Sequence, residues 1–180
     1  MKEIAKVPLK DLIFLDESGA NLQMAPRYGR GYKKNRVYYA VPFNRGNRLT
    51  LMSAISIKRV EAALYGEWSA NGEIFLHFIE EFLCPKLRKG KVIIMDNVAF
   101  HQVKGVREAI EKTGARLIYL PPYSPDLNPI EKMWSKIKNY LRRASARSLD
   151  KFRISINFAY KSIESSDLEN WFHHCGYRFQ

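Results

Sequence analysis

Two aspartates, each at the end of a short apolar run, are the residues most able to do chemistry together. Residues 12–15 are LIFL and lead into Asp16, and residues 92–95 are VIIM and lead into Asp96. Both runs have the length and composition of buried strands. In open α/β sheets, sites form at the carboxyl ends of parallel strands. If these strands are neighbours, the two carboxylates repel each other and raise a pKa unless a cation neutralises them.

Glu131 is the third acid of this candidate site. It lies 35 positions after Asp96, near the start of a predicted helix that follows the Pro-rich loop PPYSPDLNP. A helix that begins beside the sheet edge points its first turn at the same place. Mg²⁺ prefers oxygen ligands, and two ions roughly 3.5–4 Å apart can activate the attacking oxygen and stabilise the leaving one in phosphodiester displacement. The three acids therefore predict a metal site for phosphodiester chemistry.

Each acid also has a purely structural interpretation. An Asp after a strand is often a turn or cap residue. Asn128 to Glu131 fits a capping box, with Asn128 as the N-cap, Pro129 at the first helical position and Glu131 at the third. Taken alone, Glu131 is better explained as part of this cap, and Glu17 shows that single acids are common. Only the combination of three acids favours a catalytic site.

The elements that must position these acids follow an α/β pattern. Strands are predicted at residues 12–15, 36–43, 48–57, 92–95 and 116–120, with a further short strand at 65–69. Helices are predicted at 71–87, with Asn71 as N-cap, at 103–112, from about 129 to 142, from 149 to about 163, and at 167–174. Strands come first and then alternate with helices. This order predicts one α/β domain over residues 1–180, antiparallel at first and parallel later.

The charge of the sequence indicates a polyanionic partner. Lys and Arg number 30 against 18 Asp and Glu, giving a net charge of +12, and such a field attracts nucleic acid or an anionic membrane surface. No signal-peptide core is present, and no apolar run approaches the roughly 20 residues that span a bilayer, so nucleic acid is favoured and no membrane partner is expected. Cys84 and Cys175 fit no zinc or redox spacing, which predicts a reduced, cytosolic setting.

Three segments resemble signature segments of the mariner-like superfamily of DDE transposases, in particular its bacterial insertion-sequence members. They are FLDESG at residues 14–19, IIMDNVAFH at 93–101 and LPPYSPDLNPIEKMWSKIK at 120–138. PRYGRGYKKNRV at 26–37 also resembles the family's segment after the first aspartate. The resemblance runs from about residue 12 to beyond residue 141, and its third segment is long and unusual.

The resemblance implies an RNase H-like fold, in which a five-stranded mixed sheet of order 3-2-1-4-5 carries helices on both faces. It implies that Asp16, Asp96 and Glu131 are the catalytic triad and hold two Mg²⁺ or Mn²⁺ ions. The expected activity is hydrolysis of DNA at transposon ends, followed by attack of the freed 3′-hydroxyl on target DNA, usually at TA. By the same resemblance we expect a homodimer in the bacterial cytoplasm, associated with the nucleoid.

Such transposases usually carry an N-terminal helix-turn-helix region that binds the terminal inverted repeats. Asp16 lies near the start of the sequence, so this region is expected to be absent. The sequence is then an isolated catalytic domain, one product of a split reading frame or a decayed copy. The helix-turn-helix region would be a separate or fused partner.

Further residues are expected around the site. Asn97, His101 and Asn128 are predicted to lie beside it, and His101 is expected either to orient a carboxylate or contact phosphate, or to cap the helix predicted at 103–112. Trp134 is expected to pack in the core. Basic residues on the Glu131 helix and in the loop after Asp16 are candidates for DNA contacts, with a solvated surface as the alternative for each. These candidates are Lys132, Lys136, Arg142, Arg143, Arg27, Arg30, Lys33 and Lys34.

Two other functions remain open at this point. An RNase H-like nuclease of repair or RNA removal uses the same carboxylate chemistry, although the segment SPDLNPIE argues against it. A catalytically idle DNA-binding or oligomerisation module derived from a transposase is the second alternative, and the three intact acids argue against it.

Overall fold

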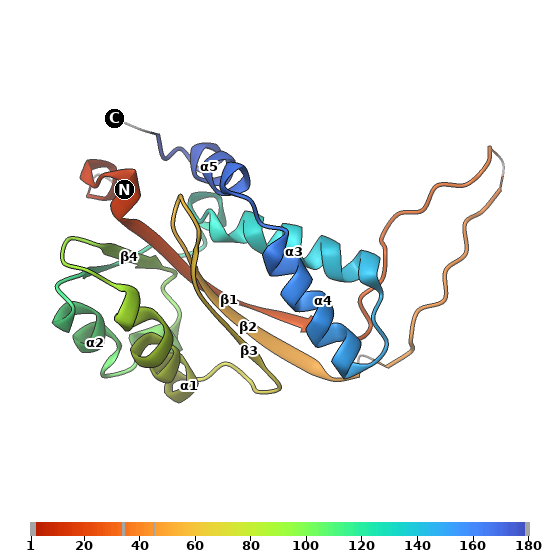
Figure 1. The fold of residues 1–180 in the computed structure, drawn as a ribbon, viewed down its shortest axis with the longest axis horizontal. Helices are drawn as coiled ribbons and strands as arrows, with labels where there is room; N and C mark the ends of the chain where they lie inside the picture. Colours follow the sequence, from red (N-terminus) through yellow and green to blue (C-terminus); the bar gives the residue numbers. More distant parts are fainter. Residues whose placement is uncertain (1–2, 34, 45, 179–180) are drawn as a thin grey trace.

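A five-stranded mixed sheet forms the centre of the protein (Figure 1). The computed structural model describes residues 3–33, 35–44 and 46–178. The strands are β1 (Leu12–Asn21), β2 (Arg48–Ile55), β3 (Val60–Gly66), β4 (Val92–Met95) and β5 (Arg116–Tyr119). Their order is β3-β2-β1-β4-β5, with antiparallel pairing from β3 to β1 and parallel pairing from β1 to β5. The predicted order 3-2-1-4-5 is confirmed.

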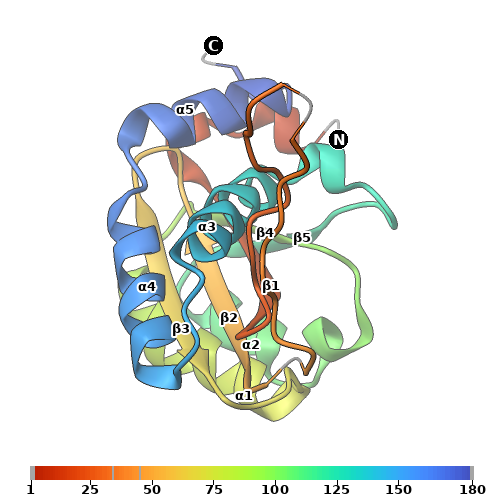
Figure 2. The ribbon, with the colours of Figure 1, turned by 90° about the vertical axis from the view of Figure 1, so that its right-hand side faces the viewer.

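Helices cover both faces of this sheet, as predicted (Figures 1 and 2). One face carries α1 (Gly72–His77) and α2 (Val106–Lys112), and α1 continues as a π-helical segment (Phe78–Leu83) and a 3-10 turn (Cys84–Lys86). The other carries α3 (Ile130–Ala144), α4 (Leu149–Lys161) and α5 (Ser165–His174). Further 3-10 turns span Ile4–Lys6, Leu9–Asp11, Ala99–Gln102 and Pro125–Leu127. The apolar strand β4 is buried along its whole length because helices cover it on both sides.

Alternation along β1 divides its side chains between the two cores. Leu12 and Phe14 pack on the side of α3, whereas Ile13 and Leu15 pack on the side of α1 and α2. This follows from the two-residue period of a strand. The strand also runs on to Asn21, so Asp16 lies within it rather than after its end, contrary to the prediction. The polar residues after Leu15 stay in the strand because β2 pairs with β1 from Phe14 to Asn21.

The predicted strand at 36–43 is wrong. Residues 22–47, which we call the arm, connect β1 to β2, and the described part of the arm projects from the body and contains no strand (Figure 1). The large apolar side chains of residues 37–43 are exposed, so they have no pleated surface to pack on, and strand propensity alone does not create a ladder. The outgoing and returning segments of the arm approach each other closely at Gly29 and Gly31. A Cβ added at these glycines would come within 2.7 and 2.8 Å of Val37.

Other boundaries differ by a few residues. β3 spans Val60–Gly66, so the observed strand is longer and begins earlier than the strand predicted at 65–69. α2 begins three residues after the predicted start, because the 3-10 turn at Ala99–Gln102 and Gly105, with φ +102°, precede it. Asn71 is the N-cap of α1, as predicted, and its Oδ1 accepts from the Ile74 amide at 2.9 Å. Across the described residues, none of the helices is both long and apolar enough to span a bilayer.

Candidate active site

The parallel pairing of β1 with β4 brings the two aspartates to one edge of the sheet. Leu12 pairs with Val92 and Phe14 with Ile94. The same register continued by two residues places Asp16 beside Asp96. Adjacent strands are about 4.8 Å apart, so the two carboxylates come from neighbouring backbones.

Asp16 is buried and held by a tryptophan from α3. Its side chain points to the α3 side of the sheet, where Trp134 Nε1 donates a hydrogen bond to Asp16 Oδ2 at 3.0 Å. Burial, and then the nearby charges of Glu17 and Glu131, raise the pKa of Asp16 from 3.8 to about 8. Trp134 lies in the core, as predicted, and additionally fixes one oxygen of Asp16. The site is therefore electrostatically short of positive charge.

His101 joins Asp96 to a fourth acid, Glu17. Its Nδ1 lies 2.6 Å from Asp96 Oδ1 and its Nε2 lies 3.0 Å from Glu17 Oε2. Glu17 reaches it because successive side chains of β1 point to opposite faces, and the ring of Phe75 stacks on the imidazole at 4.3 Å. Burial lowers the pKa of His101, but the close carboxylates of Asp96 and Glu17 outweigh this effect and raise it to about 9. His101 is fully buried between two carboxylates and caps no helix.

The capping box considered for Glu131 does not form. α3 begins at Ile130 without a side-chain cap, and the link between Asn128 and Glu131 is a backbone bond from the Glu131 amide to the Asn128 carbonyl at 3.2 Å. Asn128 is buried, and its Oδ1 has no well-aligned partner among the described residues. Asn128 is extended, with φ −110° and ψ 99°, and its side chain lines the cavity instead of accepting from the helix amides. Glu131 is consequently exposed and free of the structural role that competed with a catalytic one.

The three predicted acids line one cavity of about 330 Å³ at the carboxyl end of the parallel strands. Asn97 and Asn128 line it as well, together with the loop of residues 120–125. Two buried oxygens at this place, Asp96 Oδ1 and Asn128 Oδ1, lack a well-aligned donor within the described part of the chain. His101 Nδ1 is close to the former but is poorly aligned for a hydrogen bond.

This donor set fits a hard divalent cation. All of the groups are oxygens, the acids are mutually repelling, and Mg²⁺ takes such ligands. Within the described ranges, no three His, Cys, Asp or Glu side chains already converge tightly enough to form a complete metal cage. One reason is visible in the contacts: Trp134 holds an oxygen of Asp16, and His101 holds an oxygen of Asp96.

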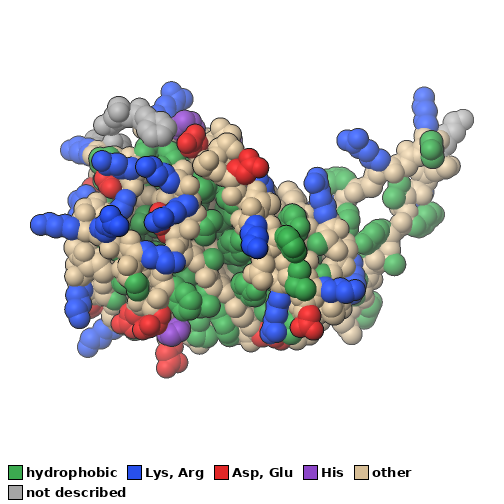
Figure 3. Space-filling view, viewed as in Figure 1, with side chains coloured by type: hydrophobic (Ala, Val, Ile, Leu, Met, Phe, Trp, Pro, Cys, Tyr) green, Lys and Arg blue, Asp and Glu red, His purple; other side chains and the backbone are tan. Residues whose placement is uncertain are grey.

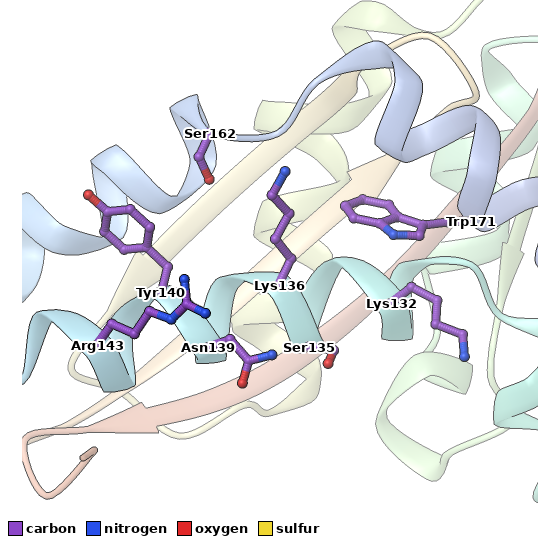
Figure 4. Close-up of a pocket in the computed structure, with 8 residues that line it drawn as sticks. All are labelled: Lys132, Ser135, Lys136, Asn139, Tyr140, Arg143, Ser162 and Trp171. Carbon is purple, nitrogen blue, oxygen red and sulfur yellow. The ribbon is translucent and has the colours of Figure 1, made fainter. Parts of the chain in front are cut away.

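The predicted DNA-contact residues fall on different surfaces. Lys132 and Lys136 line the side of α3 that faces α5, where Lys136 pairs with Asp167 (Figure 4). Arg142 lines the other side, next to the arm, and Arg143 borders both. Arg27, Arg30 and Lys33 are exposed on the arm, and Lys34 lies outside the described residues. Figure 3 shows Lys and Arg side chains over both body and arm.

Three residues of this region were not singled out from the sequence as site residues. Glu17 was set aside as an ordinary acid, although it directly follows Asp16 on a strand and so had to point to the opposite face. Trp134 was assigned only to the core. Lys138, half-buried near Glu131, lies seven positions after that residue, which is two helical turns and the same face. Helical spacing from Glu131 was therefore the available signal.

Comparisons with known proteins give a consistent picture. The family model described as DDE superfamily endonuclease matches residues 11–153. A comparison with curated protein sequences gave no significant match. Among solved structures, the fold is similar to the Mos1 strand transfer complex (TM-score 0.77, 16% identity, 93% of this chain and 52% of that chain) and to the Mos1 mariner paired end complex with Mn (0.79, 15%, 97% and 55%).

The catalytic domain of Mos1 mariner transposase, solved alone, is also similar, with a TM-score of 0.71 at 13% identity over 97% of this chain and 81% of that chain. At these identities the likeness concerns the fold. The chain spans about half the length of the longer Mos1 chains, 52% and 55% in the two complexes above.

Proposed function

Because the chain belongs to the DDE superfamily endonucleases, we propose that it is the catalytic domain of a mariner-like transposase. It cuts DNA at transposon ends and joins the freed 3′-hydroxyl to target DNA. The observation that carries this proposal is the single cavity lined by Asp16, Asp96 and Glu131. The Mos1 structures of similar fold support it, since they include a strand transfer complex and a paired end complex.

Asp16, Asp96 and Glu131 are proposed to hold two divalent ions, Mg²⁺ or Mn²⁺. Bound there, such ions activate the attacking hydroxyl and stabilise the leaving oxygen of an in-line displacement. Two matched Mos1 structures are described with Mn and two with Mg. In this chain the buried oxygens of Asp96 and Asn128 and the elevated pKa of Asp16 support the assignment.

The surrounding residues hold the acids in place. Trp134 donates to Asp16 Oδ2 and leaves the other carboxylate oxygen for the cavity. His101 fixes Asp96 and carries positive charge between Asp96 and Glu17, so the site is not left with four uncompensated acids. Water, and then a DNA 3′-hydroxyl, serve as nucleophiles, so no side chain needs to attack phosphorus.

The wider setting is proposed from the sequence resemblance. Residues 1–180 act as one catalytic domain, and a helix-turn-helix region, on the same chain or a separate one, binds the transposon ends. The domain works as a homodimer on TA targets, in the bacterial cytoplasm at the nucleoid, as part of the insertion-sequence branch. The candidate DNA contacts are those of the arm (Arg27, Arg30, Lys33, Lys34) and of α3 (Lys132, Lys136, Arg142, Arg143).

Strand transfer is the activity that tests this proposal. The substrate is a pre-cut duplex carrying the inverted repeat that flanks the coding sequence, with plasmid as target and Mg²⁺ or Mn²⁺ present. We expect joined products, reduced more than about 100-fold by Asp96→Ala, since even indirect support of a metal site is worth 10–100-fold. Asp126→Ala is the matched control, because this exposed acid lies in the neighbouring loop outside the cavity.

The alternatives give different products. Cleavage without joining would identify an RNase H-like nuclease, and DNA binding without metal-dependent cleavage would identify an idle DNA-binding module. Unchanged nicking by Asp96→Ala in a clean preparation would refute the site assignment.

A further inference from the structure

Helix α3 separates two hollows, which differ in their relation to the catalytic cavity. The hollow in Figure 4 faces α4 and α5, and there Lys136 and Trp171 lie beside each other. The second, about 620 Å³ in volume, lies between α3 and the base of the arm. We call it the α3 groove, and its lining relevant here is Arg27, Tyr28, Glu131, Lys138 and Arg142. Glu131 lines both the α3 groove and the catalytic cavity, so the two spaces adjoin at this residue.

The groove residues of α3 form one line that starts at the catalytic acid. Lys138 and Arg142 follow Glu131 by 7 and 11 positions, which is close to two and three helical turns. At 1.5 Å per residue, this line extends about 16 Å from Glu131 to Arg142. One strand of B-form DNA rises about 3.4 Å per nucleotide, so the line matches roughly five nucleotides.

The cations along this line lie close enough to act on one another, and Lys138 also feels the charges of Glu131 and Asp16. Burial lowers the pKa of Lys138, with Arg142 and Arg27 acting in the same direction against Glu131 and Asp16. Burial, and then Arg27, also lower the pKa of Arg142. Among the described residues, none of these three cations has a carboxylate oxygen within ion-pair distance. On the opposite side of the helix, by contrast, Lys136 is paired with Asp167.

Partly buried like charges cost folding free energy, and an anionic ligand removes that cost. The repeating spacing fits a polyanion better than a single anion. Because the groove adjoins the cavity of the three acids at Glu131, the polyanion expected here is the one whose phosphodiester is cut in that cavity.

Resting on the function proposed above, we propose that the α3 groove binds the DNA strand that carries the scissile phosphate. Successive phosphates contact Lys138 and Arg142 from α3 and Arg27 from the arm. The side of α3 bearing Lys132 and Lys136 is not part of this track, which divides the basic residues of one helix into two groups with different roles.

Salt dependence of DNA binding tests this division. The full chain is titrated with a fluorescent 30-base-pair duplex of mixed sequence in EDTA, at a series of NaCl concentrations. Each lost phosphate contact lowers the slope of log affinity against log salt by about 0.9. We expect the double variant Lys138→Ala, Arg142→Ala to lower the magnitude of the slope by about 1.8. The double variant Lys138→Arg, Arg142→Lys keeps both charges and should keep the wild-type slope.

A matched control removes the same charge elsewhere. Lys58→Ala with Lys112→Ala takes away two exposed cations remote from the groove lining and should leave the slope within about 0.5 of the wild type. Equal slopes for the groove pair and the control pair, in variants that melt cooperatively, would overturn the inference. So would a larger loss from Lys132→Ala with Lys136→Ala.

The experiments distinguish a wrong proposal about the α3 groove from a wrong proposal about catalysis. Metal-dependent strand transfer with a groove-independent salt slope would refute the groove alone. A groove-dependent slope without any metal-dependent cleavage or joining would support the groove and refute the catalytic proposal.

Discussion

Replacing Asp16 by Asn is expected to stabilise the metal-free protein at neutral pH while abolishing catalysis. Burial and the charges of Glu17 and Glu131 raise the pKa of Asp16 from 3.8 to about 8. Between these two values, the folded protein binds more protons than the unfolded chain. The free energy of unfolding then falls by about 1.4 kcal/mol for each pH unit.

Asn has no proton to bind and still offers Trp134 an acceptor oxygen, so it escapes this cost. From pH 5 to pH 7 the stability advantage of Asp16→Asn over the wild type should grow by up to about 3 kcal/mol. Water or a cation that reaches Asp16 lowers its pKa, which makes this figure an upper bound. The gain should level off above pH 8, where Asp16 is ionised in both states.

Urea unfolding in EDTA at pH 5, 6, 7 and 8 measures this difference for both proteins. Two results would refute the claim that burial and nearby acids raise the pKa of Asp16: a stability difference between the two proteins that does not change with pH, or an Asp16→Asn protein less stable than the wild type at pH 7. Adding Mg²⁺ at pH 8 should stabilise the wild type and leave Asp16→Asn nearly unchanged, because ligand binding to the folded state alone raises stability.

Three further substitutions address the supporting contacts. Trp134→Phe keeps the ring in the core but removes the donor to Asp16, and should cost about 1–3 kcal/mol of stability by urea unfolding and lower strand transfer at least about tenfold. The folded-state pKa of His101 is raised from 6.5 to about 9, so its protonated form stabilises the protein below pH 6.5 and this contribution is lost as pH rises to 9. His101→Gln should therefore flatten the fall in melting temperature between pH 6.5 and 9 in EDTA. Asn71→Ala should cost about 1 kcal/mol in urea unfolding with no change in strand transfer, because it removes only the N-cap bond to Ile74.

The sequence predicted the sheet because its central strands are determined locally. VIIM at 92–95 is apolar on both faces, and only a strand covered on both sides buries such a run. The arm shows the opposite case. RVYYAVPF at 36–43 has strand propensity, but a strand also needs a hydrogen-bonded neighbour, and the sequence carries no sign of whether one is present.

The sequence predicts the three acids of the site, but it does not predict the contacts that Glu17 and Trp134 make there. Asp16 and Asp96 directly follow short apolar runs and Glu131 lies in the first turn of α3, and the sequence marks each of these places clearly even though β1 runs on past Asp16. The roles of Glu17 and Trp134 depend on which face of β1 each residue meets and on where α3 crosses the sheet. Such contacts join residues 84 and 118 positions apart, and no local pattern specifies them.

Anomalous diffraction from crystals soaked in Mn²⁺ shows directly whether the three acids hold metal. We expect manganese peaks inside the cavity lined by Asp16, Asp96 and Glu131, with oxygens of these three acids at about 2.1 Å. An empty cavity at Mn²⁺ concentrations that support cleavage, or manganese held by other residues, would contradict this expectation.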